Sequence, residues 1–131
     1  MAEVARIMVA TDLSSGAAQA LDRGFLLARA SGARFTVVHA VGIDALMPLR
    51  QFLGEDAAAV AEKIVEEAAA RLKELAADSP VKDGVAVDLR VERGYPGTVI
   101  PAIAETEAVD LTLVGAHGSG FLERMLLLST P

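Results

Sequence analysis

The sequence contains no cysteine and no tryptophan, and its aromatic residues are limited to one tyrosine and four phenylalanines. The absence of cysteine excludes disulfides, thiolate metal sites and thiol nucleophiles. With so few aromatic side chains, a core must be filled by Val, Leu, Ile and Ala, as in α/β domains with buried parallel strands. At 131 residues the chain is long enough for a single domain, residues 1–131, around one such core.

Basic residues are fewer than acidic ones: the sequence has 12 Lys and Arg and 18 Asp and Glu, and its formal net charge is −6. Binding to nucleic acid without sequence preference, or to an anionic membrane, needs a basic surface, so we expect neither role. No apolar run reaches the roughly 18 residues of a membrane-spanning helix, and the N-terminus has no secretory signal pattern. We therefore expect a soluble, cytoplasmic protein.

Short apolar runs alternate with longer segments of helical periodicity. Strands are predicted at residues 7–10, 35–41, 85–92 and 111–114, and helices at 17–30, 55–77, 98–108 and 121–128. Strand 85–92 alternates apolar and polar residues, which is typical of a sheet edge. Gly32 stands where a helix-ending glycine belongs, and Pro101 falls in the first turn of its helix, where a missing N–H is tolerated. This order predicts an α/β fold with a doubly wound parallel sheet of four strands.

In such sheets ligands bind at the carboxyl ends of the strands, near the switch in strand order. The loops of interest therefore follow Ala10, Val41 and Val114. Asp12 comes directly after the first strand, and its carboxylate could accept hydrogen bonds from a ribose or a base. The alternative role for Asp12 is that of a turn-former or helix cap. Ser14 and Ser15 are better explained as helix caps.

The third loop carries Gly115, His117, Gly118 and Gly120 between an apolar strand and a helical segment. Such glycines let backbone N–H groups approach a phosphate, although they also form ordinary tight turns. The spacing is neither G-x-G-x-x-G nor a Walker loop. His117 has no obvious orienting partner, so we expect it to line the site without acting as a catalyst.

His39 lies inside a predicted strand and is interpreted as a core histidine whose hydrogen bonds are satisfied. The two histidines are far apart in the sequence, and no carboxylate cluster has the spacing of metal ligands. No metal site built from side chains is therefore expected, and any Mg²⁺ would arrive with a nucleotide.

Several segments together resemble the universal stress protein family. Residues 7–14 resemble its opening strand and loop, residues 37–41 its second strand, and residues 110–118, with Gly94 and Ile103-Ala104, its most distinctive stretch. The resemblance covers almost the whole chain. It implies a Rossmann-like sheet of the adenine nucleotide alpha hydrolase-like type, with strand order 3-2-1-4-5. Family members continue with another helix and a fifth strand, which this sequence does not contain; either these residues are missing from the sequence, which we favour, or the sheet has four strands.

The resemblance also implies a site for ATP or AMP. Members that bind ATP have the pattern G-x-x-G, nine residues, then G-S/T; Gly115, Gly118 and Ser129 match it, and Leu128 replaces the third glycine. The bulk of leucine hinders approach of the backbone to phosphates, so the residues leave undecided whether ATP binds. Binding of AMP or adenosine would be weakened less. The implied site consists of Ala10, Asp12, Ala40 and Val114 at the base and ribose, and of Gly115, His117, Gly118, Ser129 and Thr130 at the ribose and phosphates.

The leading hypothesis is a cytoplasmic regulator of the stress response that binds an adenine nucleotide and, as the resemblance implies, forms a homodimer. The alternative is a family member that does not bind nucleotide and acts through dimerisation and protein contacts; Leu128 and the apolar segment 42–54 favour it. No Ser-His-Asp arrangement, general base or set of metal ligands is apparent. We therefore assign no catalytic residue and expect at most slow ATP hydrolysis.

Overall fold

The structure, a computed structural model, describes residues 4–42, 54 and 56–115. Its strands form one parallel sheet in the order β3-β2-β1-β4. The strands are β1 (Arg6–Thr11), β2 (Arg34–Val41), β3 (Val87–Arg93) and β4 (Leu111–Gly115). All four predicted strands are confirmed, and the alternating strand β3 lies at an edge as expected. The order agrees with the first four positions of the order 3-2-1-4-5.

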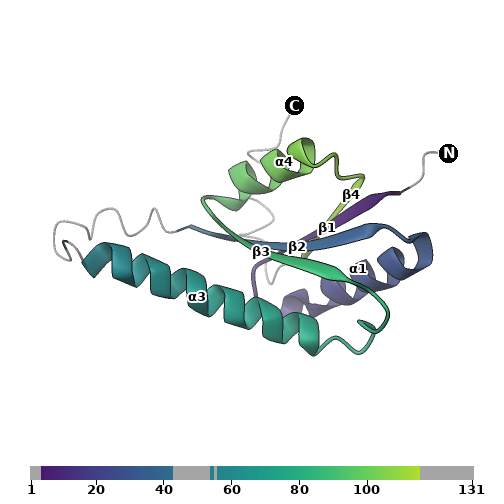
Figure 1. Cartoon of the computed structure of the whole chain (residues 1–131), viewed down its shortest axis with the longest axis horizontal. Helices are drawn as coiled ribbons and strands as arrows, with labels where there is room; N and C mark the ends of the chain where they lie inside the picture. Colours follow the sequence, from purple (N-terminus) through teal and green to yellow (C-terminus); the bar gives the residue numbers. More distant parts are fainter. Residues whose placement is uncertain (1–3, 43–53, 55, 116–131) are drawn as a thin grey trace.

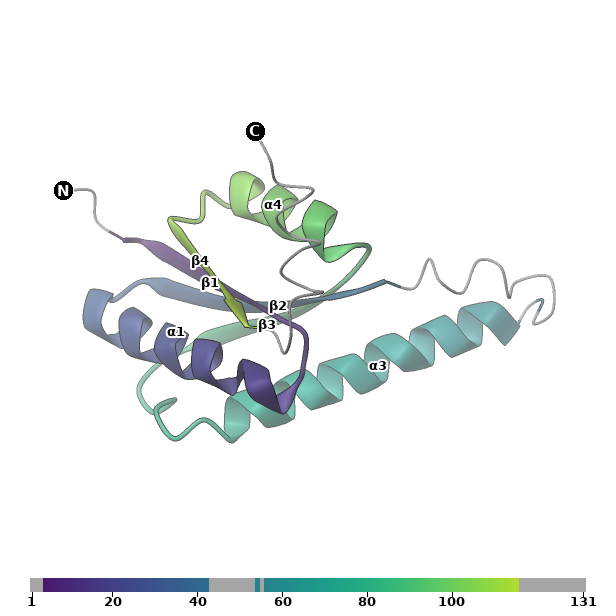
Figure 2. The same cartoon turned by 180° about the vertical axis from the view of Figure 1, so that it is seen from behind.

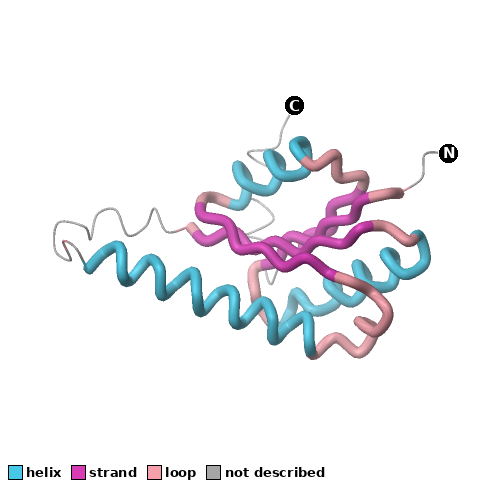
Figure 3. Tube along the Cα trace, viewed as in Figure 1, coloured by secondary structure: helices cyan, strands magenta, loops and turns pink. Residues whose placement is uncertain are grey.

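Helices cover both faces of this sheet, which makes it doubly wound. A short 3-10 helix, η1 (Ser15–Ala17), leads into α1 (Ala18–Ser31), while α3 (Asp56–Ala77) precedes β3 and α4 (Pro96–Thr106) precedes β4. Figures 1 and 2 show α1 and α3 on one face and α4 on the other, and the tube in Figure 3 shows the strands side by side between them. The helix predicted at 121–128 and most of the apolar segment 42–54 lie outside the described residues.

The core has two parts because successive strand residues point to opposite faces of the sheet. On the α1 and α3 side the buried side chains include Ile7, Leu21, Phe25, Phe35 and Leu72. The α4 side is smaller, and its buried residues are Met8, Ala10, Val38, Ile100 and Ile103. These are mostly aliphatic side chains, as the composition predicts.

The ends of two helices show where local sequence signals succeeded and failed. Gly32 ends α1 in the left-handed region, with φ 72°, and its N–H donates to the carbonyl of Ala28 at 2.8 Å, as predicted. The prediction for Pro101 is wrong, because α4 begins at Pro96 and Pro101 lies inside the helix. Tyr95, with extended backbone, and Pro96, with its fixed φ, start the helix two residues earlier than expected.

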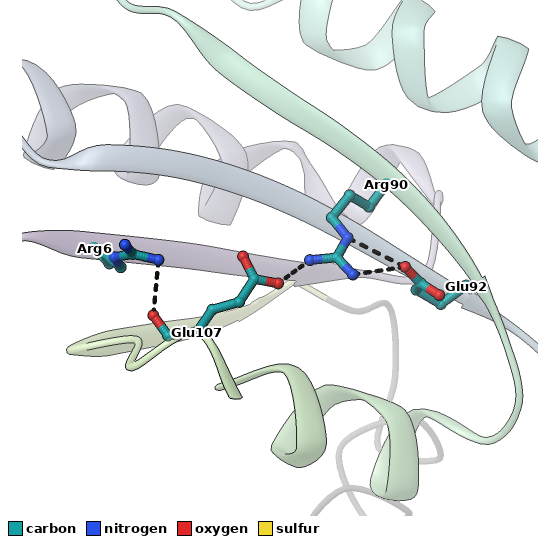
Figure 4. A network of polar contacts seen from close by, with 4 residues as sticks. All are labelled: Arg6, Arg90, Glu92 and Glu107. Carbon is teal, nitrogen blue, oxygen red and sulfur yellow. Dashed lines mark hydrogen bonds and ion pairs between the residues drawn. The ribbon is translucent and has the colours of Figure 1, made fainter. Parts of the chain in front are cut away.

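An ionic network joins β1, β3 and the end of α4 on the α4 side of the sheet (Figure 4). The guanidinium of Arg90 pairs with Glu92 at 2.8 Å and with Glu107, and Arg6 donates to the main-chain carbonyl of Glu107 at 3.0 Å. The hydrogen bond to Glu92 is the largest effect and raises the pKa of Arg90 above its usual value; burial opposes it, and the hydrogen bond to Glu107 and the charges of both carboxylates add to the rise. The network pairs the charged side chains that β3 carries on the α4 side of the sheet, where they are partly exposed.

Candidate functional site

At the carboxyl edge of the sheet, β1 and β2 stop pairing before β2 ends. Their last paired residues are Ala10 and Val38, whereas β2 continues beside β3 as far as Val41, which pairs with Arg93. On its other side, β1 remains paired with β4 up to Thr11 and Gly115. Among the described residues, β2 beyond Val38 therefore has a neighbouring strand on one side only. Main-chain groups alternate along a strand, so Ala40 faces the β1 side, whereas the Val41 carbonyl faces β3 and Gly94.

Asp12 forms a tight turn at the end of β1. Its carboxylate accepts hydrogen bonds from the N–H of Ser14 at 2.9 Å and from the Ser14 hydroxyl. Leu13, between them, has φ 67°, a left-handed conformation that is unusual for a residue other than glycine. The turn-forming role of Asp12 is thus confirmed, and its role toward a nucleotide stays a prediction.

The expectation that Ser14 acts as a side-chain helix cap is wrong. Ser14 occupies the N-cap position of η1, but its side-chain oxygen accepts no backbone N–H of the helix; its hydroxyl donates to the carboxylate of Asp12. Ser15 is the first residue of η1 and is exposed. The Ser14 hydroxyl thus supports the turn at Asp12 as a donor, whereas a helix cap would have used its oxygen as an acceptor for a backbone N–H.

The structure brings together five of the residues expected at the site. The N–H of Asp12 donates to the carbonyl of Gly115 at 3.1 Å, which joins the ends of β1 and β4. Ala10, Ala40 and Val114 lie on the α4 side of three neighbouring strands; Ala10 and Ala40 are buried, and Val114 is half-buried. The remaining predicted residues, His117, Gly118, Ser129 and Thr130, lie outside the described residues, as does Leu128.

Gly115 has a packing role that its motif did not indicate. A Cβ at this position would lie 3.0 Å from the carbonyl oxygen of Ala17 and 3.0 Å from the Cβ of Ala20. A glycine therefore allows β4 to approach the start of α1 closely. This requirement exists whether or not a phosphate binds nearby.

His39 is a hydrogen-bonded strand histidine, as interpreted from its position. Its Nδ1 lies 2.8 Å from the main-chain oxygen of Thr11, across the gap between β2 and β1. Thr11 is almost completely buried, so a hydrogen bond to its carbonyl replaces solvent contact. The sequence indicated that the ring of His39 would be hydrogen-bonded, but only the strand register identifies the partner as the carbonyl of Thr11.

Sequence reasoning missed the loop after β3, which also reaches this edge. The N–H of Gly94, a residue with φ 134°, donates to the carbonyl of Val41 at 2.9 Å. The neighbouring Tyr95 is 52% exposed. The turn Gly94-Tyr95-Pro96-Gly97 was visible as a turn, but its place beside the end of β2 depends on the pairing of β2 with β3.

Within the part of the chain that the structure describes, no three His, Cys, Asp or Glu residues come close enough together to hold a metal ion. In the same part, none of the helices combines the length and the apolar character that crossing a membrane requires.

The order of the strands and the loops that gather at their carboxyl ends define an α/β protein of the doubly wound, Rossmann-like class, in which ligands bind at the switch point. Within that class, the family model described as Universal stress protein family matches residues 3–131. The chain therefore belongs to the universal stress protein family.

Solved structures of the same fold include a universal stress protein in complex with cAMP, 20% identical, with a TM-score of 0.60 over 85% of this chain and 71% of that one. The universal stress protein UspA from Lactobacillus plantarum is 23% identical, with a TM-score of 0.59 over 92% of this chain and 82% of that one. Protein Rv1636 from Mycobacterium tuberculosis H37Rv is 25% identical, with a TM-score of 0.53 over 88% of this chain and 73% of that one. No curated protein matches the chain.

Proposed function

We propose that this chain binds an adenine nucleotide at the carboxyl edge of its sheet and acts as a regulatory protein of the stress response. The observation that carries the proposal is the early end of β1–β2 pairing beside the Asp12 turn. Membership in the universal stress protein family supports it, as does the cAMP complex of a structural relative. The nucleotides to test are ATP, AMP and cAMP.

The nucleoside part of such a ligand fits the described residues. The main-chain N–H and carbonyl of Ala40 face a position without a neighbouring strand among the described residues, and adenine carries an adjacent donor and acceptor that can pair with a strand edge. Ala40 and Val114 offer a small apolar surface beside this edge, and the carboxylate of Asp12 is an acceptor for ribose hydroxyls. The phosphates would fall to Gly115, His117, Gly118, Ser129 and Thr130, by the resemblance of that loop to the family pattern.

In this proposal the protein is a cytoplasmic homodimer, and nucleotide binding changes its conformation or its contacts with other proteins. Any Mg²⁺ arrives with the nucleotide, since no side-chain cluster for a metal occurs among the described residues. The proposal assigns no catalytic residue, and ATP hydrolysis is at most slow. Sedimentation with and without nucleotide tests the dimer, and phosphate release during incubation with ATP tests the activity.

Calorimetric titration of the purified protein with each nucleotide tests the site. Asp12→Asn keeps an oxygen for the turn but removes the charge, and we expect about tenfold weaker binding, since a hydrogen bond to a charged group is lost. Asp88→Asn makes the same change in charge on an exposed carboxylate near the amino end of the strands and should leave affinity unchanged. A wild-type protein that binds none of the three nucleotides would contradict the proposal. Equal losses in the two variants would assign the effect to net charge.

A further inference from the structure

His39 connects β1 and β2 at the point where their backbones stop pairing. The last pair of the ladder is Ala10 with Val38, and one residue further along β2 the imidazole Nδ1 lies 2.8 Å from the carbonyl oxygen of Thr11. The side chain thus holds the end of β1 without closing the gap between the two backbones. A continued ladder would have closed that gap.

The proton on the His39 ring can be assigned from this contact. A main-chain carbonyl oxygen only accepts hydrogen bonds, so Nδ1 must carry the hydrogen and donate it. In the neutral ring, Nε2 then holds the lone pair. The contact therefore specifies one tautomer of His39, and that tautomer can be observed directly.

The carbonyl of Thr11 and the N–H of Asp12 belong to the same peptide group. His39 donates to this group from β2, and the group donates to the carbonyl of Gly115 on β4 at 3.1 Å. One planar peptide is therefore fixed from both neighbouring strands. The next residue, Leu13, has φ 67°, a conformation that its surroundings must hold in place.

From this arrangement we propose that His39 is a positioning residue for the nucleotide site. It fixes the Thr11–Asp12 peptide and so sets the direction of the Asp12 carboxylate, while keeping the β1-facing main-chain groups of Ala40 open for the base. The inference rests on the proposed function. It adds a residue that does not itself need to touch the ligand.

The test compares three substitutions at His39 in calorimetric titrations with AMP and cAMP. His39→Asn places an amide N–H near the position of Nδ1 and should bind within about threefold of wild type. His39→Gln carries the same amide nearer the position of Nε2, and His39→Leu has no donor; both should bind about tenfold more weakly, the scale of one lost hydrogen bond. Thr36→Val, at the other end of β2, is the control for altering a half-buried polar side chain of this strand.

A difference between the Asn and Gln variants separates positioning from general packing, because a packing defect would weaken both alike. Nitrogen-15 chemical shifts of the wild-type ring should show the Nδ1–H tautomer, which can be measured without any ligand. If wild type binds nucleotide and the Gln and Leu variants bind equally well, the inference is wrong and the proposed function stands. If His39→Leu does not fold, the affinity of the Gln variant alone decides between positioning and no effect. If wild type binds no nucleotide, the proposed function fails and the inference fails with it.

Discussion

Replacing Gly24 by alanine tests how closely α1 packs on the sheet. A Cβ at Gly24 would lie 2.6 Å from the ring atoms Cε1 and Cζ of Phe35 and 2.7 Å from Cγ2 of Val9, whereas carbon atoms in contact prefer about 3.5–4.0 Å. Phe35 and Val9 are essentially inaccessible to solvent. The ring of Phe35 also meets that of Phe25 in an edge-to-face contact, with centroids 4.9 Å apart. The added methyl group therefore has three close neighbours and little space into which they can move.

The expected free-energy change combines two opposing effects. Overfilling a well-packed core costs about 1–3 kcal/mol. An alanine inside a helix gains about 1 kcal/mol over glycine. Because three atoms would be nearly 1 Å too close, the cost should fall in the upper part of its range, as judged from typical contact distances. We expect Gly24→Ala to lower the free energy of unfolding by about 1–2 kcal/mol.

Urea unfolding followed by circular dichroism measures this change. Gly42→Ala is the matched control, because a Cβ at Gly42 meets nothing within 4 Å and its φ lies outside the range that disfavours side chains. The control should be neutral, or more stable by up to about 1 kcal/mol, through the lower entropy of its unfolded chain. A Gly24→Ala protein as stable as the control would refute the view that this part of the core is closely packed.

Three further changes test other contacts. Gly115→Ala should lower the free energy of unfolding by about 1–2 kcal/mol in urea, because its Cβ would press on the main chain at the start of α1. Asp110→Ala should lower it by about 1 kcal/mol, because the carboxylate accepts two main-chain N–H groups at the start of β1, at 2.7 and 2.9 Å. Arg90→Gln should lower it by about 0.5–1 kcal/mol, less at high salt, since the ion pairs are partly exposed. The pKa of Arg90 is raised on folding, so its stabilisation is complete below the unfolded pKa and is lost only above it. The difference between wild type and Arg90→Gln should therefore be constant between about pH 6 and pH 10 when thermal unfolding is followed across that range.

Elements whose signals are local were predicted well from the sequence. The strands appear as apolar runs because a parallel sheet covered on both faces buries most of their side chains. The glycine after α1 was recognisable because few other residues accept a left-handed backbone at a helix end. The start of α4 was misplaced because a turn sequence with two glycines and a proline does not reveal which residue first adopts helical geometry.

The candidate site was predicted less completely because it depends on strand register. Asp12 and Gly115 could be identified as loop residues, but their hydrogen bond follows from the alignment of β1 with β4. The gap between β1 and β2 depends on how the two strands are aligned, since both continue past the last pair, β1 as Thr11 and β2 as His39, Ala40 and Val41. His39 shows the same limit: its residue type and strand were evident, and its partner 28 positions away was not.

Two residues that contribute to the family resemblance also have structural roles in the fold. Asp12 holds a turn through Ser14, and Gly115 allows β4 to pass close to α1. The fold requires both structural roles even without a nucleotide. The presence of these residues is therefore stronger evidence for the fold than for nucleotide binding. The edge at Ala40, which has no partner strand on the β1 side among the described residues, distinguishes the two cases better, because leaving a strand edge unpaired gives no packing advantage. In the proposed function, the base of the nucleotide pairs with the main-chain groups of Ala40 at this edge. The titrations of the Asp12 and His39 variants therefore test this chain's function more directly than further comparison of its motifs.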